Sequence, residues 1–230
     1  MLKDIYTDTK IPFIEGYFYH VFNRGNNREK IFYDDENCKY FLRKFDEYLS
    51  EYLNVYAFCL LPNHFHFLVK VKKLSKPCRF KKPARFNNKV TLTTKPCRSE
   101  RPTRLEEKDD LNKIIIQLFS NFFNSYSKSI NKQENRHGSL FEKHFKRKII
   151  DSEEYLSRII FYIHLNPVYH HVCQSFENYQ WSSYKKILNR CKSKLSKKEV
   201  LEYFSGRENY IFFHREHERD FKEIEKYLIE

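Results

Sequence analysis

Glycine is scarce in this chain, and its scarcity argues against one large class of function. The 230 residues include 4 glycines, and neither a G-x-G-x-x-G nor a G-x-x-x-x-G-K-[ST] pattern occurs among them. Both patterns use glycine to let the backbone approach phosphate groups closely. The sequence therefore gives no support to binding of a nucleotide through a glycine-rich loop.

Long apolar runs and paired cysteines are also missing. No apolar stretch approaches the length of a membrane span, and the N-terminus has no signal-peptide core, so we expect a cytoplasmic protein with no membrane partner. The 6 cysteines form no C-x-x-C pair, which argues against a zinc-ribbon site. In a cytoplasmic chain of this size we expect free thiols.

Positive charge is present in excess. The formal net charge is +13, which favours a polyanionic partner, with nucleic acid ahead of an anionic membrane surface. Between residues 72 and 104 lie twelve Lys or Arg and four prolines, against the single acidic residue Glu100. We interpret about 73–108 as a basic insertion, which either follows a phosphate backbone or is a disordered surface loop.

Hydrophobic patterning predicts seven core elements, because alternating and helical periods follow one another along the chain. In chain order they are a strand (16–25), a helix (34–52), two strands (54–61 and 64–72), a helix (111–132), a strand (138–150) and a helix (152–166). The last helix is expected to end at Asn166, since a residue before proline avoids helical backbone angles.

This order predicts the α+β class. The first six elements match a ferredoxin-like split βαβ sandwich with an antiparallel sheet, and the seventh is an added helix. We therefore expect one main domain over residues 1–172. Residues 173–230, with a helical stretch at about 196–204, are expected to form a small, mainly helical C-terminal extension.

Two histidines flank a phenylalanine in the segment Leu61–Val69. Successive side chains of a strand point to opposite faces, so His64 and His66 are expected on one face and Phe65 in the core. Two adjacent imidazoles on a rigid element are what a divalent metal site needs. The alternative is a partly buried strand that happens to carry two histidines.

The last predicted core helix supplies further candidates. Tyr162 and Asn166 are four residues apart and share a helical face. A tyrosine hydroxyl is a usable nucleophile when a metal or base activates it, and an Asn carboxamide oxygen is a suitable ligand for Mg²⁺ or Mn²⁺. With His64 and His66 these residues form a coherent set for phosphoryl transfer.

Other residues near these motifs have competing interpretations. Tyr126, on the preceding helix, is a second candidate nucleophile, but position 130 is Ile and offers no amide four residues on. His164 is expected at the surface or in packing.

Six residues are candidates for contacts with nucleic acid, because they are basic and fall near the predicted site: Arg24, Lys143, His144, Lys146, Arg147 and Lys148.

Three separated motifs occur together in this chain: LPNHFH at 61–66, GSLFE at 138–142 and YIHLNPV at 162–168. In this order they resemble the single-tyrosine HUH transposases (IS200-like), and most closely the REP-associated tyrosine transposases. The resemblance covers about residues 14–188, and the basic insertion is its clear departure.

The resemblance implies a DNA-nicking and joining enzyme. Mg²⁺ or Mn²⁺ would be held by His64, His66 and Asn166. Tyr162 would attack single-stranded DNA beside a short imperfect hairpin, giving a 5′-phosphotyrosine link and a free 3′-hydroxyl. Proteins of this family work as monomers or homodimers, some with the tyrosine helix exchanged between active sites.

Three other functions remain open from the residues alone. The fold can serve a non-catalytic DNA- or RNA-binding protein, although such a protein need not keep both histidines, the tyrosine and its Asn. A metal-dependent phosphodiesterase that uses water would cleave without a covalent adduct. A membrane-surface protein is suggested only by the charge.

Overall fold

The computed structural model describes residues 9–73 and 104–217. Most of the predicted basic insertion and the end of the predicted C-terminal extension lie outside these residues. No helix in the described ranges is both long enough and apolar enough to cross a bilayer.

A four-stranded antiparallel sheet forms the centre of the molecule. Its strands lie in the order β2-β3-β1-β4, and every neighbouring pair is antiparallel. The strands are β1 (Phe18–Arg24), β2 (Leu53–Leu61), β3 (His64–Val71) and β4 (Lys146–Ile150). This order and the β-α-β-β-α-β sequence of elements confirm the predicted ferredoxin-like α+β class.

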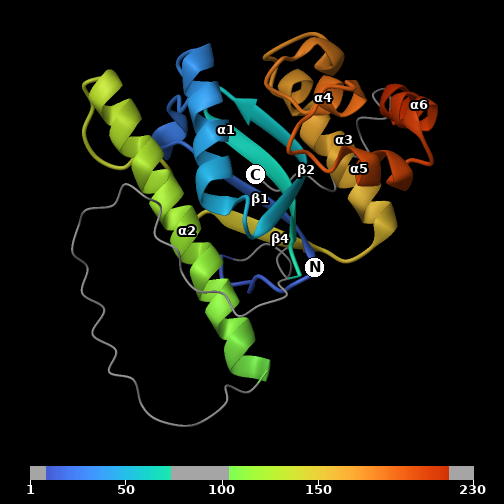
Figure 1. The fold of residues 1–230 in the computed structure, drawn as a ribbon. Coiled ribbons are helices and arrows are strands. Elements are labelled where there is room, and N and C mark those ends of the chain that lie inside the picture. The colour runs from blue at the N-terminus through green and yellow to red at the C-terminus, as the bar shows by residue number, and fades with distance from the viewer. Residues whose placement is uncertain (1–8, 74–103, 218–230) are drawn as a thin grey trace, which may run out of the picture.

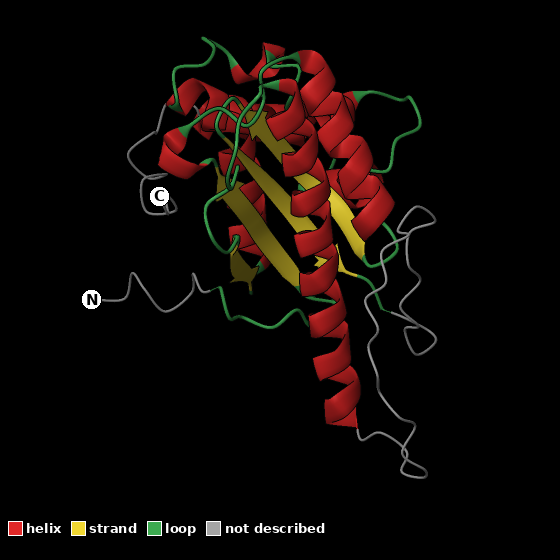
Figure 2. Cartoon of the chain, turned by 90° about the vertical axis from the view of Figure 1, so that its left-hand side faces the viewer, coloured by secondary structure: helices red, strands yellow, loops and turns green. Residues whose placement is uncertain are grey.

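Helices cover both faces of the sheet (Figure 1). The two on one face are α1 (Asp35–Leu49) and α2 (Arg104–Gln133), and Figure 2 shows the long α2 crossing in front of the strands. The four on the other face are α3 (Glu153–Tyr169), α4 (Tyr184–Leu188), α5 (Lys197–Tyr203) and α6 (Arg207–His217). Short 3-10 turns lie at Asn26–Arg28 and Phe176–Asn178.

Each face of the sheet has its own apolar core, because side chains alternate along every strand. On β3, Phe65 and Phe67 pack toward α1 and α2, and the Phe67 ring stacks on Phe45 with centroids 4.3 Å apart. Leu68 belongs to the other core, with Ile159 and its neighbours on α3. The same alternation directs the two histidines of β3 toward α3.

Three element boundaries differ from the sequence prediction by more than the few residues seen at the ends of β1 and α1. Helix α2 begins at Arg104, ahead of the predicted residue 111. The predicted strand at 138–150 is reduced to β4, and His144, two residues before it, adopts a left-handed backbone angle (φ 66°) that interrupts regular strand geometry. The predicted helix end at Asn166 is wrong.

Helix α3 continues through Pro167 to Tyr169. Proline removes one backbone donor, but the next turn still closes, since the His170 amide donates to the Asn166 carbonyl at 2.9 Å. The helix begins as expected, with the Ser152 hydroxyl accepting the Tyr155 amide at 3.2 Å.

The C-terminal extension joins the main core through a buried chain of hydrogen bonds. The His214 Nδ1 donates to the Tyr210 carbonyl at 2.7 Å, which leaves its Nε2 to accept from His164 Nδ1 at 2.9 Å. The His164 Nε2 then accepts from the Ser183 hydroxyl at 2.7 Å, and that oxygen accepts from the Phe58 amide of β2 at 2.9 Å. His164, which was expected at the surface or in packing, is therefore fully buried.

Replacement of His214 is expected to change how stability depends on pH. Burial lowers the pKa of His214 from 6.5 to about 3. Between these values the unfolded chain binds a proton here that the folded chain does not, so the free energy of unfolding falls as pH falls. One such group contributes a slope of about 1.4 kcal/mol per pH unit.

Urea unfolding between pH 4 and 7 measures this slope for the native chain and for His214→Gln. We expect a shallower slope in His214→Gln and an unchanged one in His137→Gln, which removes an exposed histidine. An equal slope in His214→Gln and the native chain would contradict the expectation.

Candidate metal and nucleophile site

The β2–β3 hairpin presents the two predicted histidines side by side. A two-residue connection, Pro62-Asn63, joins the strands, and His64 and His66 both lie on the face that α3 covers. Their ring centroids are 5.1 Å apart, and the side chains are 6% and 1% exposed. The predicted arrangement on one face is therefore present.

Helix α3 places the predicted tyrosine over these histidines. The rings of Tyr162 and His66 are 5.6 Å apart and nearly perpendicular. One turn further on, the Asn166 side-chain amide donates to the Tyr162 carbonyl at 2.8 Å. That bond anchors the nitrogen end of the amide, and Oδ1 of Asn166 is buried with no hydrogen bond among the described residues.

Asn63 fixes the proton of His64. Its Oδ1 lies 2.6 Å from the His64 Nδ1, and a carboxamide oxygen accepts hydrogen bonds but does not donate them. The His64 Nδ1 therefore carries the proton in the neutral ring, and Nε2 keeps its lone pair. This is the tautomer required of a ligand that binds a metal through Nε2.

The electrostatic setting keeps His66 neutral. Burial, followed by the neighbouring His20, His64 and His170, lowers the pKa of His66 well below its usual range. A neutral imidazole is the form that binds metals. The ring nitrogens of both strand histidines and the buried Asn166 oxygen form a mixed donor set, in which imidazole suits several transition-metal ions and the amide oxygen suits Mn²⁺ or Mg²⁺.

Asn166 is the candidate for a third donor. Within residues 9–73 and 104–217, no group of three or more His, Cys, Asp or Glu side chains is arranged to hold a metal ion. The carboxamide oxygen of Asn166, buried without a hydrogen bond to any described residue, is the candidate third protein ligand beside His64 and His66. The chemistry of the three residues fits a divalent ion.

Two further histidines that sequence reasoning missed lie beside this group. The His20 Nε2 is 2.9 Å from the His66 Nδ1, and the His170 ring is 4.5 Å from the His64 ring. His20 comes from β1, so only the register between strands reveals it. His170 had a signal in the sequence, since it follows Asn166 by four residues, but the predicted helix ended before it.

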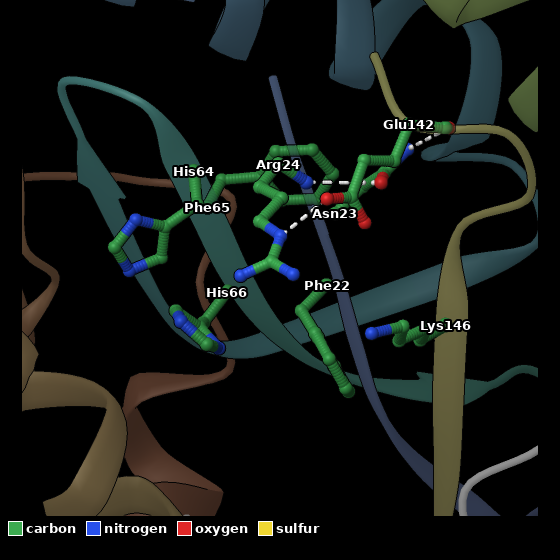
Figure 3. Close-up of a pocket in the computed structure, with 8 residues that line it drawn as sticks. All are labelled: Phe22, Asn23, Arg24, His64, Phe65, His66, Glu142 and Lys146. Atoms are coloured by element: carbon green, nitrogen blue, oxygen red, sulfur yellow. Dashed lines mark hydrogen bonds and ion pairs between the residues drawn. The ribbon is translucent and has the colours of Figure 1, made fainter. Parts of the chain in front are cut away.

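A water-sized cavity of about 20 Å³ opens beside His64 and His66. Arg24 lies directly opposite His64 in the β1–β3 pairing and lines this cavity. Its Nε forms an ion pair with Glu142, and its terminal amino groups turn toward the space between His66 and Phe22 (Figure 3). A guanidinium held in this way keeps both terminal amino groups, with their four N–H donors, for an anion.

The competing nucleophile lies on the other side of the sheet. Tyr126 is buried against α1, and its hydroxyl donates to the Ile31 carbonyl at 2.7 Å. Burial raises its pKa. The sheet separates Tyr126 from His64 and His66, whereas Tyr162 is in ring contact with His66.

The predicted basic residues of the 143–148 segment separate into three groups. Lys146 and Lys148 pair with Phe22 and His20 of β1, so they share the face of the histidines. Lys143 and His144 are exposed in the preceding loop. Arg147 points to the opposite face.

The assignment of Arg147 to nucleic-acid binding is corrected. Its side chain is 2% exposed, its Nε donates to the Ile11 carbonyl, and its guanidinium lies 4.8 Å from the Phe13 ring centroid and 5.3 Å from that of Phe145. The alternation of β4 turns every second side chain inward, so this cation is a core residue.

Comparisons with known proteins give one structural match. No family model matches the chain, and no curated protein matches it. The chain is similar in structure to a REP-associated tyrosine transposase that was solved bound to a REP hairpin. The two are 12% identical, the match covers 79% of this chain and 84% of the other, and the TM-score is 0.48. Function must therefore be inferred from the residues of this chain.

Replacement of Arg147 is expected to change stability, and replacement of Lys146 is expected to change the salt dependence of DNA binding. Arg147→Met should lower the free energy of unfolding by about 1–3 kcal/mol, because it removes a buried hydrogen bond. It should leave the salt dependence of DNA binding unchanged. Lys146→Gln should leave stability nearly unchanged and reduce the slope of log affinity against log salt by about 0.7–1.

Urea unfolding and fluorescence anisotropy of a labelled single strand at 50–200 mM salt measure the two effects. A loss of salt dependence in Arg147→Met, with stability unchanged, would contradict the assignment of Arg147 to the core.

Proposed function

We propose that this protein is a metal-dependent endonuclease and strand transferase for single-stranded DNA, of the transposase type. Tyr162 is the nucleophile, and His64, His66 and Asn166 hold Mg²⁺ or Mn²⁺. The substrate is a single strand beside a short hairpin, as the resemblance to REP-associated tyrosine transposases implies.

One observation carries this proposal. Helix α3 brings Tyr162 into ring contact with His66 of β3, about 100 residues away in sequence, and carries Asn166 one turn further along the helix. A binding protein that used the sheet face for its ligand would not need two imidazoles, an amide oxygen and a phenol in this combination. A phosphoryl-transfer enzyme uses all four.

The chemistry assigned to Tyr162 is a transesterification. The phenol oxygen attacks the phosphorus of a DNA phosphodiester, a bond from that oxygen to phosphorus forms, and the bond from phosphorus to the 3′ oxygen breaks. The phenol proton ends on the released 3′-hydroxyl. One phosphodiester replaces another, so a later attack by a 3′-hydroxyl rejoins strands without ATP.

The surrounding residues of the chain position the phosphate. A bound divalent ion supplies charge that polarises the phosphate oxygens. Arg24 offers its two terminal amino groups to the same phosphate, while Glu142 holds its Nε. Lys146 and Lys148, on the same sheet face, neutralise neighbouring phosphates without reading sequence.

Tyr162 lies over the histidines of its own chain and is 2% exposed. The proposed substrate phosphate would lie at the cavity lined by Arg24 and His66.

Covalent trapping tests the proposal. The protein is incubated with Mn²⁺ or Mg²⁺ and labelled single-stranded hairpins taken from the DNA that flanks its own gene. We expect a denaturation-resistant protein–DNA band in the native chain and in Tyr126→Phe, the matched control on α2, on the opposite face of the sheet. We expect no band in Tyr162→Phe, which should still bind the hairpin.

Two other outcomes identify the alternatives. Cleavage without the band, retained in Tyr162→Phe, indicates a phosphodiesterase that uses water. Hairpin binding with neither cleavage nor band, across several hairpins and both ions, indicates a non-catalytic binding protein.

The double variant His64→Ala/His66→Ala is expected to lose metal-dependent cleavage and keep hairpin binding, because it removes two of three proposed ligands. A gel-shift assay beside the cleavage assay separates the two properties. Undiminished cleavage by the double variant would reject the metal site while leaving Tyr162 as the nucleophile.

A further inference from the structure

The two strand histidines share a feature that their spacing in sequence does not show. In each, another side chain contacts Nδ1. The Nδ1 of His64 lies 2.6 Å from Asn63 Oδ1, and the Nδ1 of His66 lies 2.9 Å from His20 Nε2. Histidines that bind a metal through one nitrogen commonly donate the proton of the other to an acceptor, which fixes the tautomer and the ring.

We propose that His20 is a positioning residue for His66: its Nε2 accepts the Nδ1 proton of His66 and so leaves the Nε2 lone pair of His66 for a divalent ion. This inference rests on the proposed role of His66 as a metal ligand. It assigns a role to a residue of β1 that lies outside the three motifs of the sequence.

The hydrogen bond itself limits the possible proton positions. One proton lies between the two nitrogens. If His66 Nδ1 holds it, then His20 is the acceptor and its own proton is on Nδ1, while Nε2 of His66 keeps a lone pair. If His20 holds it, Nε2 of His66 carries a hydrogen and is not a ligand. At His64, the Asn63 oxygen requires the proton on Nδ1 and the lone pair on Nε2. We assign the same tautomer to His66.

Packing alone does not fix the orientation of His66. Its ring lies against Phe22, His20 and Tyr162, with centroids 5.7, 5.1 and 5.6 Å away. These contacts determine the plane of the ring. A half-turn of the ring about its Cβ–Cγ bond returns it to the same plane and exchanges nitrogen and carbon positions with little change of shape. The bond to His20 distinguishes the two orientations.

His20 is well placed to hold this orientation. Its side chain is 3% exposed, and its ring stacks on Phe22 at 4.8 Å. It also meets Tyr162 edge to face at 5.9 Å. His20 therefore contacts both the proposed ligand and the proposed nucleophile, while its backbone belongs to a central strand of the sheet.

The test compares two substitutions of His20. His20→Phe keeps a ring of similar shape and removes the acceptor, whereas His20→Gln restores an acceptor near the position of Nε2. His137→Phe, which removes an exposed histidine outside the proposed ligand set, is the control. Thermal unfolding establishes that each variant is folded.

The first measurement is Mn²⁺ binding without DNA, from the loss of the electron paramagnetic resonance signal of free Mn²⁺. We expect the Kd to rise about 10- to 100-fold in His20→Phe. It should stay within about threefold of the native value in His20→Gln, and it should not change in His137→Phe. Native affinity in a folded His20→Phe would overturn the proposal.

The second measurement is the tautomer of His66 in the metal-free protein, from ¹⁵N-histidine NMR spectra assigned with single variants. We expect the proton on Nδ1 in the native chain and in His20→Gln, and a mixture of tautomers in His20→Phe. A proton on Nε2 in the native chain would overturn the proposal.

The two measurements separate this inference from the proposed function. If the native chain binds no Mn²⁺ through His64 and His66, the metal site fails. The position of the His66 proton still decides whether His20 fixes the tautomer.

Discussion

The register of β3 between its two neighbours determines the rest of the site. Side chains alternate along a strand, so a slip of one residue would send His64 and His66 toward α1 and α2 and place Phe65 under Tyr162. The pairings Arg24 with His64 and Phe22 with His66 fix this register from one side. The β2–β3 hairpin fixes it from the other.

Sequence patterns predicted the parts of the fold that depend on local periodicity. The ferredoxin-like order of strands and helices, the shared face of His64 and His66, and the helical spacing of Tyr162 and Asn166 follow from periods of 2 and 3.6 residues. The structure places these residues together. The function that we infer from them remains a proposal.

The roles of His20 and Arg147 could not be predicted from local sequence patterns, because they depend on strand pairing and on which face of the sheet is buried. His20 becomes visible only when β1 is paired with β3, and Arg147 looked like its neighbours Lys146 and Lys148 until the alternation of β4 was tied to a buried face. Helix α3 passes the end predicted at Asn166, because the turn that contains Pro167 still closes through the bond from the His170 amide to the Asn166 carbonyl.

The hydrogen bonds that run from Tyr210 through His214 and His164 to Ser183 have a direction. A backbone carbonyl at one end and a backbone amide at the other decide which way every proton points. A substitution at one of these positions that puts a donor where an acceptor is needed would lose the hydrogen bonds to the residues on both sides of it in the chain. We therefore expect the residues at positions 164, 183 and 214 to covary in related sequences.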